Sequence, residues 1–173
     1  MLFSGDALEP AAVALDRITV RADSARPEVP SGLEDRMHFN SNGVFILGAQ
    51  LDSARGTPLH ELLQKRVRGV NVVLYVQTNQ HLLATGRGQT SLTQMPKADP
   101  RDRKSPSACY SQIWLDGMRI YAPGENQVVP DLGTFDAGSL QAIEFYSGPS
   151  STPAQFGGSG AACGTLLLWT RSR

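Results

Sequence analysis

Three histidines and two cysteines are the side chains best suited to metal or redox chemistry in this chain. His38, His60 and His81 are far apart in the sequence, and none stands at ligand spacing from another histidine, a cysteine or a carboxylate. Cys109 and Cys163 do not form the C-x-x-C pair that is typical of redox catalysis. The spacing therefore favours neither a dedicated metal centre nor a redox enzyme.

Two runs rich in serine and glycine, 147–151 and 158–160, are the remaining candidates for a nucleophile or a phosphate loop. Neither run has the G-x-S-x-G pattern of a nucleophile elbow between a strand and a helix. The second run is not followed by the lysine of a phosphate loop, and a strand rather than a helix comes next. We expect these glycines to allow tight backbone packing before the last strand.

Asp116 and Glu144 are the carboxylates that a paired acid–base site would need. Asp116 precedes Gly117 in a dipeptide that is typical of tight hairpin turns, so we expect it to serve the turn. Glu144 lies between Ile143 and Phe145, and we expect it to pair with a nearby arginine because a charge in apolar surroundings is costly unless paired. No catalytic constellation remains, and the sequence predicts a protein that is not an enzyme and that needs no metal or other cofactor.

The composition is that of a globular domain without a charge bias. The 173 residues are enough for one domain with its own core. Apolar residues make up 40% of the chain, and 16 basic side chains balance 16 acidic ones. This balance gives no reason to expect a nucleic acid partner. The N-terminus lacks the pattern of a secretory signal, so we expect either an artificial start or a part of a longer protein.

Local patterns predict a lead-in, one clear helix and several short strands. Residues 1–31 are interrupted by prolines and contain only a strand-like stretch at 18–22. The helix is predicted to begin with Thr57 as its N-cap and to end near Gly69. Its apolar stripe consists of Leu59, Leu62, Leu63 and Val67. Strands are predicted at 44–47, 70–76, 82–92, 143–146 and 165–170, and a long loop at 93–108.

The two cysteines each stand at the start of a predicted strand. If these strands are neighbours, the thiols of Cys109 and Cys163 fall within disulfide distance, and the alternative is two buried free thiols. Such a bridge closes a long loop and contributes about 3–4 kcal/mol in the chain-entropy description. It would also fit an oxidising compartment.

The last third of the chain contains an ordered set of turn, glycine and strand residues. The set consists of Asp116, Gly117, Ile143, Glu144, Gly148, Pro149, Phe156, Gly157, Gly160, Ala161, Gly164 and Thr170, with Arg87 and Gly88 upstream. In this order the residues resemble the plug domain of TonB-dependent outer-membrane receptors, of the kind that carries a carboxypeptidase-regulatory-like domain.

The resemblance implies an α+β fold with a small mixed β-sheet, one or two short helices and long loops. It assigns residues 32–173 to a single plug-like domain and residues 1–31 to a lead-in, whose first part could be the end of a preceding domain. The chain ends at Arg173, where the barrel of a receptor would begin, so transport by this chain alone is not expected.

The resemblance also implies partners and a location. Receptors of this family carry a TonB box near the N-terminus, and a segment similar to it consists of Asp16, Ile18, Thr19, Val20 and Ala22. The implied partners are a TonB-type periplasmic protein or a β-barrel, with a small-molecule ligand, in the outer membrane or periplasm. The implied role is gating or binding in the uptake of an iron chelate, cobalamin or a sugar. The alternative is an orphan periplasmic interaction or solute-binding domain that uses the plug scaffold without transport.

Overall fold

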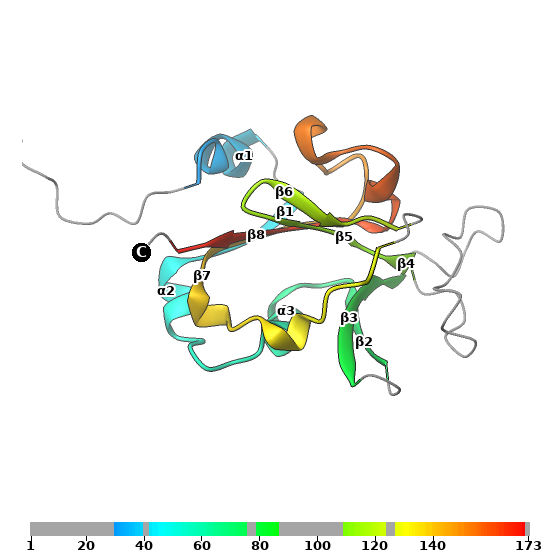
Figure 1. Ribbon diagram of the computed structural model, residues 1–173. Coiled ribbons are helices and arrows are strands. Elements are labelled where there is room, and N and C mark those ends of the chain that lie inside the picture. The colour runs from blue at the N-terminus through cyan, green and yellow to red at the C-terminus, as the bar shows by residue number, and fades with distance from the viewer. Residues whose placement is uncertain (1–29, 40–41, 76–78, 87–108, 124–126, 172–173) are drawn as a thin grey trace, which may run out of the picture.

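The computed structural model describes residues 30–39, 42–75, 79–86, 109–123 and 127–171 (Figure 1). Its helices are α1 (Leu33–Phe39), α2 (Gly48–Asp52) and α3 (Leu59–Arg66), with short 3-10 turns η2 (Leu132–Thr134), η3 (Ala137–Ser139), η4 (Ala154–Phe156) and η5 (Ser159–Cys163). Its strands are β1 (Gly43–Leu47), β2 (Val70–Tyr75), β3 (Gln80–Thr85), β4 (Cys109–Tyr110), β5 (Gln112–Leu115), β6 (Met118–Tyr121), β7 (Leu140–Tyr146) and β8 (Thr165–Thr170).

A five-stranded mixed sheet with the order β1-β7-β8-β5-β6 forms the centre of the molecule. Strand β8 pairs antiparallel with β7 and parallel with β5, so the final strand of the chain lies in the middle of the sheet. A smaller antiparallel sheet has the order β2-β3-β4. Ser111 joins the two sheets, because it donates its N–H to the carbonyl of Leu83 between β4 and β5. The predicted α+β class with a mixed sheet is confirmed.

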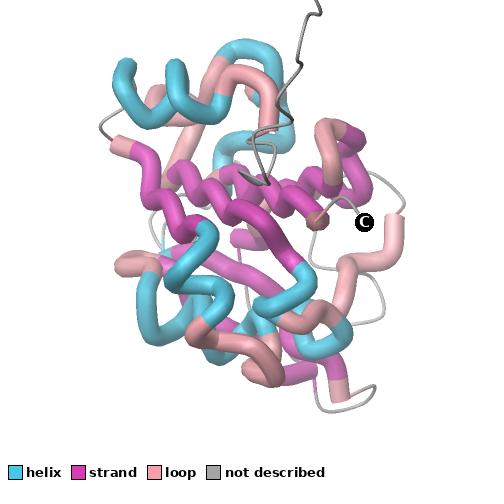
Figure 2. The backbone as a smooth tube through the Cα atoms, turned by 90° about the vertical axis from the view of Figure 1, so that its left-hand side faces the viewer, coloured by secondary structure: helices cyan, strands magenta, loops and turns pink. Residues whose placement is uncertain are grey.

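The two faces of the five-stranded sheet are covered differently (Figures 1 and 2). Helices α2 and α3 and the smaller sheet cover one face, which we call the lower face. Helix α1 and the segment 147–164 cover the other, which we call the upper face. The lower face holds the larger apolar core, including Leu51, Leu59, Leu63, Ile113, Leu132, Leu140, Ile143, Leu166 and Leu168. The upper face holds a smaller aromatic cluster of Tyr146, Phe156 and Leu167, flanked by Phe45, Trp114 and Trp169.

The β5–β6 hairpin forms at the predicted dipeptide. Asp116 and Gly117 have φ values of 49° and 80°, in the left-handed region that Asp and Gly tolerate. The Asp116 carboxylate also accepts hydrogen bonds from the backbone N–H (2.8 Å) and the hydroxyl (2.7 Å) of Thr170. The turn therefore fastens the end of β8 as well as joining two strands.

Helix α3 carries the predicted apolar stripe but begins differently from the prediction. Leu59, Leu62 and Leu63 are buried, yet the N-cap residue is Pro58, and Thr57 makes no side-chain cap. Thr57 is instead held by its backbone, since its carbonyl accepts the N–H of Ala137 at 3.1 Å. Backbone hydrogen bonds to the segment 135–137 thus replace a side-chain cap at the start of α3. The local sequence pattern does not reveal these long-range bonds.

The remaining elements match the predicted segments to different degrees. Strand β8 has its predicted bounds, β1 begins one residue before the predicted run 44–47, and 143–146 is the second half of β7. Strand β3 ends at Thr85, before the end of the predicted strand 82–92, and 87–92 lies outside the described residues. Helices α1 and α2 were not predicted, so the described residues contain three α-helices, one more than the resemblance implied.

Candidate functional site

Among the described residues, the most unusual polar group is the carboxylate of Glu144, on the upper face of the five-stranded sheet. Strand β7 lies between β1 and β8, and the side chain of Glu144 is 0% exposed. Arg36 donates to both of its oxygens, from Nε to Oε2 at 2.8 Å and from Nη2 to Oε1 at 2.7 Å. Tyr146 Oη donates to Oε2 at 2.6 Å, and Trp169 Nε1 donates to Oε1 at 2.7 Å. The carboxylate is therefore fully satisfied without water. The predicted pairing of Glu144 with an arginine is confirmed.

Arg36 connects α1 to this carboxylate and to the aromatic cluster. Its side chain is 8% exposed, and its third nitrogen, Nη1, donates to the carbonyl of Ser31 at 3.1 Å. The guanidinium carbon lies 5.5 Å from the ring centroids of both Phe156 and Trp169. Such contacts are favourable for a desolvated guanidinium. One side chain thus joins a helix, a strand and the segment 147–164.

The charges of Arg36 and Tyr146 are fixed at neutral pH. Burial alone would lower the pKa of Arg36, but the hydrogen bond and negative charge of Glu144 outweigh it and raise that pKa. Burial, followed by the hydrogen bond to Glu144, raises the pKa of Tyr146 far above its ordinary value. The tyrosine therefore remains a neutral donor, and the arginine remains a cation. With these protonation states, Arg36 and Tyr146 are suited to holding elements together.

The segment 147–164 places Phe156 in the cluster through hydrogen bonds to its backbone. Gln112, which is 0% exposed, donates from Nε2 to the carbonyl of Phe156 at 2.6 Å and to Oγ1 of Thr165 at 2.7 Å. A Cβ atom at Gly160 would lie 2.7 Å from Oε1 of the same glutamine. Gly164 has a φ of 93°, and a Cβ there would lie 2.8 Å from the carbonyl oxygen of Tyr146. These two glycines are needed for close approach rather than for phosphate binding.

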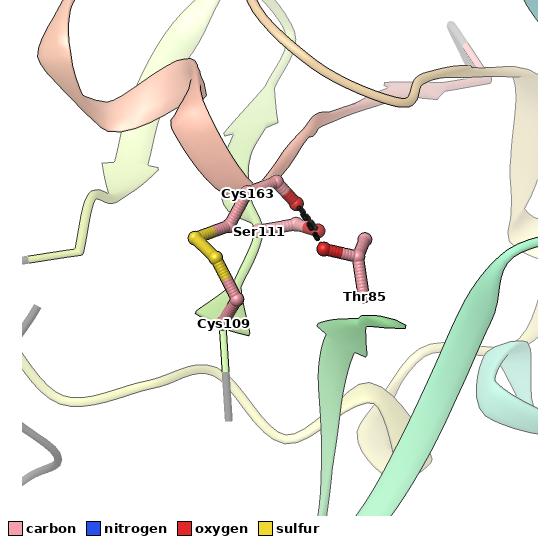
Figure 3. Close-up of a disulfide and its surroundings, with 4 residues drawn as sticks. All are labelled: Thr85, Cys109, Ser111 and Cys163. Carbon is pink, nitrogen blue, oxygen red and sulfur yellow. Dashed lines mark hydrogen bonds between the residues drawn. A yellow bond between two sulfur atoms is a disulfide. The ribbon is translucent and has the colours of Figure 1, made fainter. Parts of the chain in front are cut away.

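Cys109 and Cys163 form a disulfide with a Cα–Cα separation of 5.2 Å (Figure 3). The predicted bridge is confirmed, and the alternative of two free thiols is wrong. Thr85 Oγ1 and Ser111 Oγ both donate to the carbonyl of Cys163, at 3.0 and 2.8 Å. The bridge and these two hydrogen bonds fasten η5 to the place where β3, β4 and β5 meet.

The plug-motif residues from Gly148 to Gly164 lie in the segment that covers the upper face, whereas Ile143 does not lie on that face (Figure 1). Ile143 is 1% exposed and belongs to the lower core, because neighbouring residues of a strand face opposite sides. Gly148 accepts the backbone N–H groups of Ser151 and Thr152 at 3.1 Å each, and these bonds form the turn that contains Pro149. Gly157 donates its N–H to the carbonyl of Ala154 at 3.2 Å, directly after η4.

The other predicted residues are not brought to this site. Arg87 and Gly88 lie outside the described residues, and so does the TonB-box-like segment of Asp16, Ile18, Thr19, Val20 and Ala22. Sequence reasoning missed three donors to Glu144, namely Arg36, Tyr146 and Trp169. Two of these donors could have been proposed from strand geometry. Tyr146 lies two residues along the same strand and so faces the same side as Glu144, and Trp169 is a diagonal neighbour of Glu144 across the β7–β8 pair.

The part of the chain that the structure describes contains neither a metal-binding cluster nor a membrane-spanning helix. No group of three or more His, Cys, Asp and Glu side chains there could hold a metal ion. None of the helices there is long and apolar enough to cross a membrane.

Comparison with known proteins finds similarity among solved structures. No family model matches the chain, and no curated protein matches it. A mutant of the ferric enterobactin receptor PfeA from Pseudomonas aeruginosa is similar over 80% of this chain and 18% of that receptor, with 19% identity and a TM-score of 0.49. The siderophore receptor PirA from Acinetobacter baumannii is similar over 81% of this chain and 18% of that receptor, with 20% identity and a TM-score of 0.43. The chain spans less than a fifth of their length.

Proposed function

We propose that this chain is a plug-like module of a TonB-dependent outer-membrane receptor. Its role is non-catalytic: joined to a β-barrel, it gates or binds during the uptake of an iron chelate, cobalamin or a sugar. Residues 32–173 form the plug-like domain and residues 1–31 form the lead-in. The module works in the outer membrane or the periplasm.

The observation that carries this proposal is the convergence of the motif residues around Glu144. Phe156 contacts the guanidinium that binds Glu144, and Gly164 and Gly160 permit the close approach of the segment that carries Phe156. These residues form an ordered motif in the sequence, and nothing in their order requires them to meet. Their meeting in one well-packed cluster favours a common scaffold over a coincidence of common dipeptides.

The lead-in supplies the partner-binding segment of this proposal. Asp16, Ile18, Thr19, Val20 and Ala22 form the candidate TonB-binding strand, which would add to an exposed sheet edge of a TonB-type protein through main-chain hydrogen bonds. Eight residues separate Ala22 from Ser31, whose carbonyl accepts a hydrogen bond from Arg36. The candidate strand is thus separated in sequence from the described domain by only a few residues.

A binding titration against the periplasmic C-terminal domain of TonB tests the proposal. The full chain is compared with the variant Ile18→Pro/Val20→Pro, because proline removes the backbone donors that strand addition requires. The matched control is Ala11→Pro/Val13→Pro, which has the same spacing outside the candidate strand. We expect the wild type and the control to bind, and the first variant to lose binding.

Other outcomes contradict parts of the proposal. If both proline variants bind TonB as tightly as the wild type does, the candidate strand in the lead-in is not the TonB-binding segment. No binding by the wild type would contradict the receptor role and favour the orphan periplasmic interaction domain, which needs the same scaffold but not TonB.

A further inference from the structure

Two histidines that the proposed function does not use are stacked on each other beneath the five-stranded sheet. His60 lies in the first turn of α3 and His81 in β3, with ring centroids 3.7 Å apart and an angle of 14° between the ring planes. Their Nδ1 atoms are buried, and among the described residues neither has a hydrogen-bond partner. The Nδ1 atoms therefore do not fix the two rings through hydrogen bonds, and the charge state of the rings decides whether their stacking is favourable.

The groups that face this pair come from three elements. Asp131, the cap of η2, lies on the β3 side, with Oδ1 3.8 Å from Nδ1 of His81, and it also accepts the backbone N–H of His81 at 2.8 Å. Glu61 follows His60 on α3. Burial lowers the pKa of His60, and the charge of His81 lowers it further, whereas Glu61 and Asp131 act in the opposite direction and do not compensate.

One proton and two protons have different consequences for this stack. A single proton on the pair lies against the face of a neutral ring, an arrangement that resembles a cation–π contact. A second proton places two cations in parallel rings 3.7 Å apart, with little water between them. The contact that can relieve this repulsion is the one between α3 and β3.

We propose that the stacked pair His60–His81 is an acid-sensitive contact, which the folded protein maintains with one proton and loses with two. Addition of the second proton loosens α3, with Leu59, Leu62 and Leu63, from β3 and η2. The device is independent of the proposed receptor role, since it depends only on contacts within this chain.

The direction of the effect on stability follows from proton linkage. Free histidine titrates near pH 6.5, and His60 in the folded chain takes up its proton at lower pH than in the unfolded chain. The unfolded chain thus binds more protons as the pH falls below about 6.5, and the free energy of unfolding decreases in this range.

The test is an NMR titration of the histidine rings in the full chain, from about pH 8 to about pH 5, the range in which histidines change charge. The samples are wild type, His81→Gln, His60→Gln and His38→Gln, the last being a control in α1. Amide hydrogen exchange is measured at both ends of the pH range, with β7 and β8 as internal references.

We expect the His60 midpoint to move to higher pH in His81→Gln and to remain unchanged in His38→Gln. Amides of α3 and β3 lose more protection on acidification than those of β7 and β8 in wild type, and this excess disappears in both pair variants. An unchanged His60 midpoint in His81→Gln, or an equal loss of protection in all elements of wild type, would overturn the proposal. The wild-type exchange pattern decides the matter even if a pair variant does not fold.

Discussion

Three side chains, Arg36, Tyr146 and Trp169, donate four hydrogen bonds to Glu144. A buried carboxylate is stable only when its hydrogen-bonding capacity is filled, so the loss of any one of these side chains also affects the bonds that the other two make. Among these side chains, Tyr146 is the one whose role can be tested by pH, because its burial and its hydrogen bond to Glu144 keep its phenol proton in place.

Tyr146 is expected to make the stability of the chain depend on alkaline pH. Free tyrosine ionises near pH 10, whereas the pKa of Tyr146 is raised in the folded chain by burial and by Glu144. Below about pH 10 both states keep the phenol proton; above it only the unfolded state loses the proton, and the free energy of unfolding decreases. Urea unfolding of Tyr146→Phe should show a cost of about 1 kcal/mol at pH 7 and a shallower decrease above pH 10. The same alkaline slope in both proteins would contradict this assignment.

At the residue scale, the sequence predicted the kind of partner that Glu144 has but not its identity. A charged residue inside an apolar strand requires a cation, and this requirement is local. Arg36 lies 108 positions away, and the chain contains many other basic residues. The choice among them depends on which helix covers the upper face, which no pattern near either residue records.

At the scale of elements, α1 and α3 show two ways in which a short helix is held. Helix α3 has an apolar stripe that local periodicity reveals, and its leucines are buried in the lower core. Helix α1 has seven residues, of which only Leu33 and Arg36 are buried. Isolated helices of this length are not stable in water, so tertiary contacts decide whether they form. This is why α3 could be predicted and α1 could not.

We therefore expect Arg36 to determine whether α1 stays on the upper face. Arg36→Met leaves the Glu144 charge buried with two neutral donors, and it should lower the free energy of unfolding by about 3–5 kcal/mol. The double variant Arg36→Met/Glu144→Gln should recover part of this loss, because the amide oxygen still accepts hydrogen bonds and carries no charge. Urea unfolding measures the free energy of unfolding of both variants. Proteolysis at Phe39, which is 88% exposed, reports the release of α1.

Two outcomes would contradict this role of Arg36. A single variant with near wild-type stability would mean that α1 is held by other contacts. A double variant less stable than Arg36→Met would mean that the charge of Glu144 is not the source of the cost.

At the scale of the whole molecule, the disulfide is the strongest single constraint on the chain. It encloses β5, β6 and β7 within one covalent loop, since its two cysteines are 54 positions apart. We expect Cys109→Ser/Cys163→Ser to lower the free energy of unfolding by about 3–4 kcal/mol, because the unfolded chain regains the entropy of an open loop. Denaturant unfolding measures the loss. Intact mass after alkylation, with and without reduction, verifies that the wild-type thiols are bridged.

Which strands pair with which is the part of the fold that the sequence did not predict. Most of the strand segments were visible as apolar runs, and the turn at Asp116-Gly117 predicted one hairpin. The parallel pairing of β5 with β8 and the place of β1 at the sheet edge join segments that are far apart in the chain. These pairings depend on the balance of packing on the two faces, which is a property of the assembled molecule.

The central place of the last strand has a consequence for biosynthesis. Strands β7 and β5 have β8 between them, so their pairing surfaces remain open until residues 165–170 have been synthesised and have left the ribosome. Non-local pairings of this kind also form slowly. A nascent chain stopped just before Thr165 would display two unpaired strand edges, and such edges are where chaperones bind and where aggregation starts.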